Sequence, residues 1–227
     1  MKLALFDLDH TLLPFDSGMA WTRFLVERGL LPAPAEQTYL DTCRQYVAGR
    51  LGIEAVHRAS VAPLVRFARP LLAQWAAEFE RVIRERAPAD MRSLVQRHQA
   101  AGDVCAIVTA TTRLIAEPCA RAFGVTEVLA TEAATADGTP GGALTGEIDG
   151  APCFREHKLA RVRQWLTERA PGGVAELAGF DASWFYSDSI SDLPLLQAVS
   201  NPVAVRPQER LRRHALAAGW PVLFDPV

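Results

Sequence analysis

Residues 2–12 read KLALFDLDHTL. The first part of this stretch is short, apolar and rich in residues that favour strands, which predicts a β-strand buried on both faces. Asp7 and Asp9 follow at its end. In an open parallel sheet, ligands bind at the edge where the strands end, so both carboxylates are expected at that edge. The stretch therefore predicts the first strand of an α/β fold and the start of a functional site.

Other short apolar runs also have the length of buried strands. They are residues 104–109 (VCAIVT), 182–187 (ASWFYS), 202–205 and 221–224. Between these runs the apolar residues recur at helical spacing, and this alternation predicts a mostly parallel sheet covered by helices on both faces. The glycine-rich residues 137–150 predict a β-hairpin instead, with arms near residues 129–134 and 143–148.

Residues 16–85 interrupt the alternation, because they show almost only helical periodicity. The clearest apolar stripe is Leu72, Trp75, Ala76, Phe79, Val82 and Ile83. A stripe with this spacing is typical of a helix that buries one face. We therefore expect a helical bundle inserted after the first strand. The expected division is an α/β catalytic core of residues 1–15 and 86–227 and a helical cap of residues 16–85.

Composition narrows the class of protein. The chain has 227 residues, 24 Lys and Arg against 26 Asp and Glu, and a formal charge of −2, which disfavours a nucleic-acid partner. Its four cysteines have neither disulfide nor zinc-ligand spacing, which favours a reducing cytoplasm. No apolar run reaches the length of a membrane span or a signal-peptide core. We expect a cytoplasmic monomer or homodimer with no membrane partner.

Acidic residues cluster after two of the expected strands. Asp7 and Asp9 follow the first, and Asp188 and Asp192 lie in YSDSISD after the run at 182–187. Carboxylates that converge on one edge repel one another unless a proton or a cation separates them. Magnesium binds hard oxygen ligands together with water and substrate phosphate. The pattern predicts a magnesium site at the sheet edge.

Four motifs carry a resemblance to a known family. FDLDHT, the Thr109 that ends VCAIVT, the Lys158 of EHKLARV, and SDSISD occur in the order of the haloacid dehalogenase-like phosphohydrolase motifs. The chain resembles this family over nearly its whole length, and the helical insertion resembles the cap of the phosphoserine phosphatase-like branch. YSDSISDLPLL, GALTGEIDGAPC and RLRRHALAAGWPVL resemble a bacterial subgroup of that branch, whose members are mostly assigned as general hydrolases.

The resemblance implies a fold and an activity. The fold is a Rossmann-like parallel sheet with an inserted α-helical cap. The activity is that of a phosphatase acting on a small-molecule phosphate monoester. Asp7 would attack phosphorus and form an aspartyl-phosphate, and Asp9 would act as general acid and then general base. The Thr109 hydroxyl, the Ala110 amide and the Lys158 ammonium would bind the phosphoryl group.

The resemblance also implies the cofactor. Mg²⁺ would be held by the side chain of Asp7, the backbone carbonyl of Asp9 and the side chain of Asp188, with Asp192 orienting bound water. The cation would offset the repulsion between the nucleophile and the phosphate.

Residues of the cap bear on the substrate. In phosphoserine phosphatases a cap carboxylate and a cap arginine hold the amino and carboxyl groups of serine. Asp16 takes the place of that carboxylate, but Ser60 falls near the place of the arginine, with Arg58 and Arg50 offset along the helix. A bidentate contact does not survive such an offset. A phosphate ester with an amine and no carboxylate, such as histidinol phosphate, fits this pattern better.

Other functions remain open at this point. Phosphoserine phosphatase itself is one, and a phosphotransferase that passes the phosphoryl group to an acceptor other than water is another. A phospho-receiver module also uses a phosphorylated aspartate, paired acids, a threonine and a lysine on a parallel sheet, but it needs no helical insertion.

Overall fold

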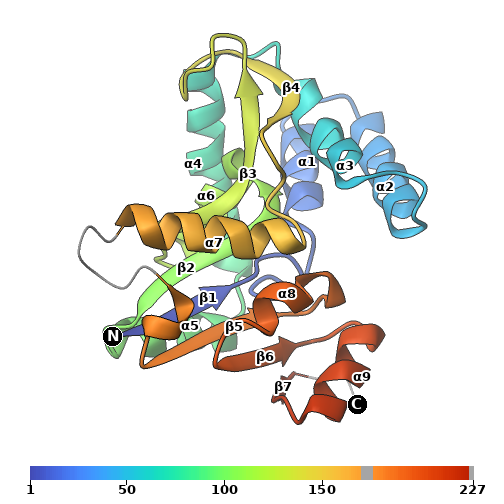
Figure 1. Ribbon diagram of the computed structural model, residues 1–227. Coiled ribbons are helices and arrows are strands. Elements are labelled where there is room, and N and C mark those ends of the chain that lie inside the picture. The colour runs from blue at the N-terminus through green and yellow to red at the C-terminus, as the bar shows by residue number, and fades with distance from the viewer. Residues whose placement is uncertain (170–175, 225–227) are drawn as a thin grey trace.

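The computed structural model of the protein describes residues 1–169 and 176–224. These residues form a seven-stranded sheet of order β4-β3-β2-β1-β5-β6-β7 (Figure 1). The strands are β1 (Lys2–Phe6), β2 (Val104–Thr112), β3 (Glu127–Thr135), β4 (Leu144–Asp149), β5 (Ala182–Ser187), β6 (Asn201–Val205) and β7 (Val222–Leu223). Every pairing is parallel except that of β4 with β3. The expected mostly parallel sheet is confirmed.

Helices fill most of the connections between strands. Five precede β2: α1 (Ser17–Glu27), α2 (Pro34–Val47), α3 (Ile53–Val61), α4 (Arg69–Arg86) and α5 (Ala89–Ala100), with a 3₁₀ turn η1 (Ala62–Leu64). Later ones are α6 (Arg113–Ala122), α7 (Glu156–Arg169), α8 (Leu193–Leu196) and α9 (Glu209–Ala218), with the turns η2 (Leu177–Gly179) and η3 (Ile190–Asp192). Within the described residues, no helix combines the length and apolarity needed to cross a membrane.

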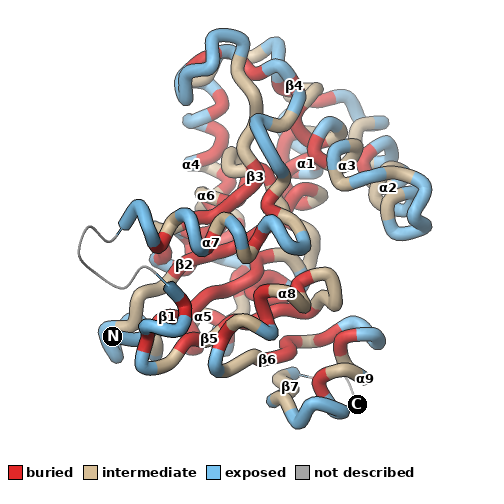
Figure 2. Tube along the Cα trace, viewed as in Figure 1, coloured by how far each residue is buried: buried red, intermediate tan, exposed pale blue. Residues whose placement is uncertain are grey.

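The sheet is buried on both faces, as the apolar first strand predicts. Leu3 and Leu5 of β1 point into a cluster formed with α7, α8 and α9. Ala4 and Phe6 point the other way, into a cluster formed with α1, α4, α5 and α6. In Figure 2 the central strands are accordingly buried along most of their length. A strand with water on neither face needs no polar residues until it ends, which is where Asp7 begins.

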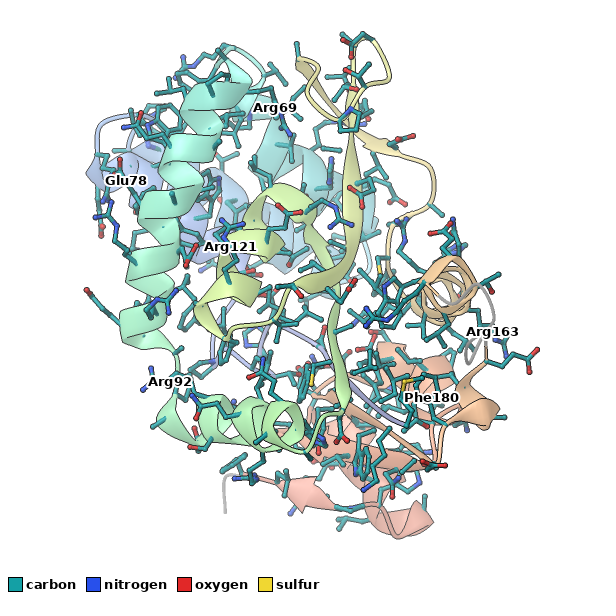
Figure 3. The ribbon with its side chains drawn as sticks, turned by 90° about the vertical axis from the view of Figure 1, so that its left-hand side faces the viewer. Arg69, Glu78, Arg92, Arg121, Arg163 and Phe180 are labelled. Atoms are coloured by element: carbon teal, nitrogen blue, oxygen red, sulfur yellow. The ribbon has the colours of Figure 1, made fainter. Side chains whose placement is uncertain are left out.

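The inserted segment is helical, as its periodicity predicts. In Figure 1, α2 and α3 stand out from the sheet beside β4, whereas α4 packs along α6. Trp21 and Phe79 of this segment share one apolar cluster with core residues of the sheet. Arg121 of α6 also contacts Glu80 of α4 at 2.7 Å, and Figure 3 shows Arg121 facing α4. The domain boundaries at residues 15 and 86 remain a prediction.

The expected hairpin is formed by β3 and β4. The first half of β3 pairs in parallel with β2, and its second half pairs antiparallel with β4. The tip reaches α4, where Arg69 donates to the carbonyl of Pro140 at 3.3 Å. Figure 3 shows Arg69 at the end of α4 nearest the hairpin. On its other side the hairpin contacts α3, where Arg58 forms two hydrogen bonds to the carboxylate of Glu147.

Candidate active site

Three neighbouring strands bring the predicted site residues to one edge of the sheet. Asp7 directly follows β1, Thr109 lies in the second half of β2, and Asp188 directly follows β5. The pairing of β1 continues one residue past the strand, because the amide of Asp7 donates to the carbonyl of Tyr186 at 2.9 Å. The backbone carrying Asp7 is therefore fixed by the sheet itself.

Lys158 joins two of the acids. It lies in the first turn of α7, and its ammonium donates to Oδ1 of Asp7 at 2.8 Å and to Oδ2 of Asp192 at 2.7 Å. All three side chains are buried. Burial alone would lower the pKa of Lys158, but the charges of Asp192 and Asp7 raise it above its usual value. Lys158 is therefore a fixed cation inside the acidic cluster.

The hydroxyl of Thr11 links the other pair of acids. It lies 3.2 Å from Oδ2 of Asp7 and 3.4 Å from Oδ1 of Asp188, and it accepts from the backbone amide of Asp188 at 3.0 Å. Gln208 donates to the other oxygen of Asp188 at 3.1 Å. The guanidinium of Arg206 donates to the backbone carbonyl of Thr11. The loop after β6 thus supports the loop after β1.

The cluster carries more acid than the lysine balances. Burial, reinforced by Asp7 and then Asp192, raises the pKa of Asp188 to about 8. Burial also raises the pKa of Asp192. Among the described residues, Oδ1 of Asp192 is a buried oxygen without a hydrogen-bond partner. Crowded carboxylates with a spare oxygen suit a hard divalent cation.

Side chains alone do not complete a metal site. Among residues 1–169 and 176–224, no three His, Cys, Asp or Glu side chains are arranged to hold a metal ion together. Lys158 lies between Asp7 and Asp192, which separates those two carboxylates. Magnesium commonly takes one or two carboxylates and completes its shell with water and substrate oxygens. The oxygens present fit such a partial ligand set.

Asp9 and Asp16 lie toward the inserted helices. Oδ1 of Asp9 accepts from the amide of Ser17 at 2.7 Å, and Oδ2 accepts from the hydroxyl of Thr111. Burial and the nearby charge of Asp16 raise the pKa of Asp9. Asp16 is the N-cap of α1: its Oδ1 accepts from the amide of Met19 at 2.7 Å and from the hydroxyl of Tyr39 at 3.0 Å. An ionised N-cap at this position stabilises the helix start.

Thr109 is oriented by its own loop. It is only 1% exposed, and its hydroxyl oxygen accepts from the amide of Thr111 at 3.1 Å. This contact occupies a lone pair and leaves the hydroxyl hydrogen available to donate. The next residue, Ala110, is half-buried.

A cavity of about 450 Å³ lies between this edge and helices α1, α2 and α3. Asp9, Ala110 and Asp16 are the predicted site residues that line it. Its wall also contains two arginines, of which Arg23 is paired with Glu36 and Arg86 lies over the ring of Phe15. The apolar and aromatic side chains of the wall are Phe15, Met19, Tyr39, Leu40, Cys43, Tyr46, Val47, Ile53, Val56, Ile115 and Ile148. The remaining predicted residues, Asp7, Thr109, Lys158, Asp188 and Asp192, are each no more than 7% exposed. The buried acidic cluster and the cavity therefore form two adjoining parts of one site.

Sequence reasoning assigned no role to several residues that contact this site. Thr11 bridges Asp7 and Asp188, and Ser187 donates to Oδ2 of Asp192 at 2.8 Å. Thr11 stands inside FDLDHT and Ser187 inside YSDSISD, so both were visible as polar residues at strand ends. Gln208 and Thr111 had no such signal, because they meet Asp188 and Asp9 only through the fold.

A second cavity, of about 540 Å³, lies between α4, α6 and the hairpin. It contains none of the predicted site residues, and two of its lining arginines, Arg113 and Arg121, are paired with glutamates. The acids at the sheet edge and the cavity above them remain the candidate active site.

Comparison with known proteins decides the family. Residues 4–197 match the model of the haloacid dehalogenase-like hydrolases. The chain belongs to that family. This haloacid dehalogenase-like hydrolase is 39% identical over 225 residues to a histidinol-phosphatase of Neisseria meningitidis, covering 98% of both chains. It is also 30% identical over 231 residues to the phosphoserine phosphatase SerB1 of Mycobacterium tuberculosis, covering 96% of this chain and 69% of that protein. These relatives show a phosphatase of the phosphoserine phosphatase-like branch, as the motifs predict.

Solved structures share the fold of this chain. A crystal structure of a protein of unknown function from Bordetella pertussis Tohama I is 44% identical and covers 98% of this hydrolase and 97% of its own chain, with a TM-score of 0.88. A substrate-bound phosphoserine phosphatase is only 17% identical, yet it covers 99% and 93% of the two chains with a TM-score of 0.62. The second likeness shows the shared fold.

Proposed function

We propose that this hydrolase is a magnesium-dependent phosphatase that cleaves a small-molecule phosphate monoester through an aspartyl-phosphate, with an amine-bearing ester such as histidinol phosphate as substrate. The observation that carries the proposal is the buried contact between Asp7 and Lys158 next to a cavity lined by Asp9 and Asp16. A nucleophile, a fixed cation and a carboxyl of raised pKa thus lie within one site.

In the first step, a carboxylate oxygen of Asp7 bonds to phosphorus as the bond from phosphorus to the ester oxygen breaks. The proton of Asp9 goes to the departing oxygen, which leaves as an alcohol. The raised pKa of Asp9 supports this role, because the acid must hold a proton near neutral pH. Lys158 and the hydroxyl of Thr109 stabilise the charge on the phosphoryl oxygens.

In the second step, water attacks the phosphorus of the aspartyl-phosphate, and the carboxylate of Asp7 leaves. Asp9, now ionised, accepts the proton of this water. Inorganic phosphate is released, and both acids return to their starting protonation. The same carboxyl therefore serves as acid and then as base.

The side chains of Asp7 and Asp188 and the backbone carbonyl of Asp9 would hold Mg²⁺, with Asp192 orienting a bound water. When bound, the cation supplies positive charge that offsets the repulsion between an ionised nucleophile and a phosphate. The raised pKa of Asp188 and the spare oxygen of Asp192 support this ligand set.

The cavity supports an amine-bearing leaving group. Asp16 lines it with a carboxylate, and the aromatic side chains of Tyr39 and Tyr46 suit a flat ring such as an imidazole. A carboxylate-binding arginine is not found at the expected place in α3. Ser60 lines the cavity there, whereas Arg58 is bound to Glu147 on the surface.

The test is a panel of esters assayed for phosphate release with Mg²⁺ and with a chelator. Histidinol phosphate and ethanolamine phosphate carry an amine and no carboxylate, phosphoserine carries both groups, and glycerol phosphate carries neither. We expect the largest kcat/KM for histidinol phosphate, and loss of activity in chelator. A preference for phosphoserine would overturn the substrate assignment, and phosphate release unaffected by chelator would overturn the cofactor.

The variant Asp16→Asn tests the proposed contact between the Asp16 carboxylate and the amine of the substrate. Asparagine caps helices about as well as aspartate, so α1 keeps its N-cap while the charge is removed. We expect KM for histidinol phosphate to rise about tenfold or more, because a hydrogen bond to a charged group contributes roughly 1.5–3 kcal/mol. Glycerol phosphate, with no amine, is the matched control: the charge of Asp16 also raises the pKa of Asp9, and an effect through Asp9 should appear equally with both esters, whereas loss of the amine contact should appear with histidinol phosphate alone. Equal changes for both esters would show that Asp16 does not bind the amine.

A further inference from the structure

Both oxygens of the Asp9 carboxyl are held by donors from separate parts of the chain. The amide of Ser17, the first residue of α1, donates to Oδ1 at 2.7 Å. The hydroxyl of Thr111, near the end of β2, donates to Oδ2. The Ser17 side chain is buried and its hydroxyl lies 3.5 Å from that of Thr111. Asp9 is thus fixed between the sheet edge and the first inserted helix.

The backbone amide of Ser17 and the hydroxyl of Thr111 differ in their hydrogen-bonding capacity. An amide can only donate, so Ser17 favours an ionised oxygen at Oδ1. A hydroxyl can donate to an ionised carboxylate or accept from a protonated one after it rotates. Thr111 can therefore keep the same contact with Oδ2 in both protonation states. The orientation of the Asp9 carboxyl can thus be held by Thr111 throughout the reaction.

We infer that Thr111 is a positioning residue for Asp9, setting the orientation from which that carboxyl gives its proton to the leaving oxygen. The inference rests on the acid and base role given to Asp9 in the proposed function. Proton transfer requires a donor within hydrogen-bond reach of the departing oxygen, so a carboxyl free to rotate transfers its proton less often. Thr111 also lines the cavity in which the proposed function places the leaving group.

The contact between Asp9 and Ser17 connects the Asp9 carboxyl to the start of α1, which borders the cavity. Ser17 directly follows Asp16, which caps α1 and lines the cavity. A shift of the start of α1 would move the amide away from Asp9, while the contact with Thr111 would remain on the sheet. Thr111 thus holds Asp9 from the sheet, whereas the amide of Ser17 holds it from the first inserted helix.

The test compares two leaving groups in the variant Thr111→Val, which keeps the shape of the side chain and removes its hydroxyl. An alkyl phosphate such as histidinol phosphate needs a proton on its departing oxygen, whereas p-nitrophenyl phosphate releases a stable phenolate that needs none. We expect kcat/KM for the alkyl ester to fall about tenfold or more, as part of the roughly 10²–10⁴ that general acid catalysis supplies. The value for p-nitrophenyl phosphate should change much less.

The ratio of the two kcat/KM values does not depend on how much of the variant is folded. Thr111→Ser keeps the hydroxyl and should restore the wild-type ratio. Thr22→Val is a matched control, because it removes a buried hydroxyl that donates to the carbonyl of Gly18 within α1. We expect it to keep the wild-type ratio.

An equal loss on both esters in Thr111→Val, or no loss on either, would overturn the inference. Failure of the proposed function would appear differently. The wild-type protein would then release no phosphate from any ester, or Asp9→Asn would leave its activity intact. A wild-type protein that is active and depends on Asp9, with an unchanged ratio in Thr111→Val, refutes only the role of Thr111.

Discussion

Oδ1 of Asp7 accepts a 2.8 Å hydrogen bond from the ammonium of Lys158, although 151 residues separate them in sequence. Both side chains are buried, at 7% and 3% exposure. A buried charge without a partner is strongly destabilising, so each of these side chains needs the other. The contact also fixes the direction of the Asp7 carboxylate at the end of β1. The same ion pair therefore contributes to the stability of the fold and orients the Asp7 carboxylate.

Asp7→Asn is expected to abolish phosphate release, with a loss of at least about 1,000-fold, because a carboxamide is not an effective nucleophile. The fold should survive, since the amide oxygen of Asn can still accept from Lys158 and one crowded acid is removed beside Asp188. The measurements are phosphate release and thermal unfolding. Asp41→Asn, in an exposed pair with Arg44, is the control and should retain activity. Turnover retained in Asp7→Asn would refute its role as nucleophile.

Lys158→Met is expected to destabilise the metal-free protein by about 3–5 kcal/mol, the range seen when one partner of a buried ion pair is removed. Methionine fills a similar space but leaves Asp7 and Asp192 without their buried cation. Urea unfolding in chelator measures the difference. Arg213→Met breaks an exposed helix pair with Glu209 and should leave the unfolding midpoint nearly unchanged. Equal stability of Lys158→Met and wild type would contradict this account.

The acids at the sheet edge make stability depend on pH when metal is removed. The pKa of Asp188 rises from 3.8 to about 8 in the native state through burial and the charges of Asp7 and Asp192. Between these values the native protein binds more protons than the unfolded chain. The stabilising contribution is therefore complete below about pH 4 and is lost as pH rises toward 8.

The corresponding experiment is a series of melting temperatures from pH 5 to 8.5, with chelator and with Mg²⁺. We expect the chelator series to decline across this window and the Mg²⁺ series to decline much less, because the bound cation favours the ionised carboxylates. Asp188→Asn should flatten the chelator series and reduce the effect of Mg²⁺. Parallel series in wild type would argue against a metal bound at these acids.

His57 connects α3 to both β2 and the hairpin. Its Nε2 lies 3.1 Å from the carbonyl of Glu147, and its Nδ1 lies 2.8 Å from the hydroxyl of Thr112. Burial lowers the pKa of His57, so the ring is neutral at pH 7. A carbonyl can only accept, so Nε2 carries the proton and Nδ1 accepts from Thr112.

His57→Ala is expected to destabilise the protein by about 1–3 kcal/mol, because it leaves the buried hydroxyl of Thr112 without this partner. Thermal and urea unfolding measure the change. The adjacent Arg58 is a matched control, since its contact with Glu147 is exposed and Arg58→Ala should change stability little. A larger effect from Arg58 than from His57 would show that the surface ion pair holds α3 to the hairpin.

Much of the fold could be predicted because its signals are local. The runs at 104–109 and 182–187 became β2 and β5 within a few residues, and the glycine-rich residues 137–150 became the turn after β3 together with β4. Buried strands need continuous apolar residues, and a turn needs glycine, so both leave a mark in neighbouring positions. The acids were equally visible, because each cluster follows its strand directly.

Other parts of the site left no local mark. EHKLARV reads as an ordinary helix start, and burial of Lys158 between two acids depends on how α7 packs against β2, β3 and α8. Thr111 is one of three threonines in residues 109–112 (TATT), and its contact with Asp9 is what distinguishes it. Gln208 meets Asp188 because β6 lies beside β5.

The sequence by itself determined which strands exist, that their carboxyl ends carry acids, and that a helical segment follows the first strand. These properties depend on the chemistry of adjacent residues. Tertiary structure alone decided which donor holds each carboxyl: Lys158 for Asp7, and Thr111 with the amide of Ser17 for Asp9. The reason is that a hydrogen bond depends on distances of about 3 Å between atoms, and packing sets those distances between segments that lie far apart in the chain.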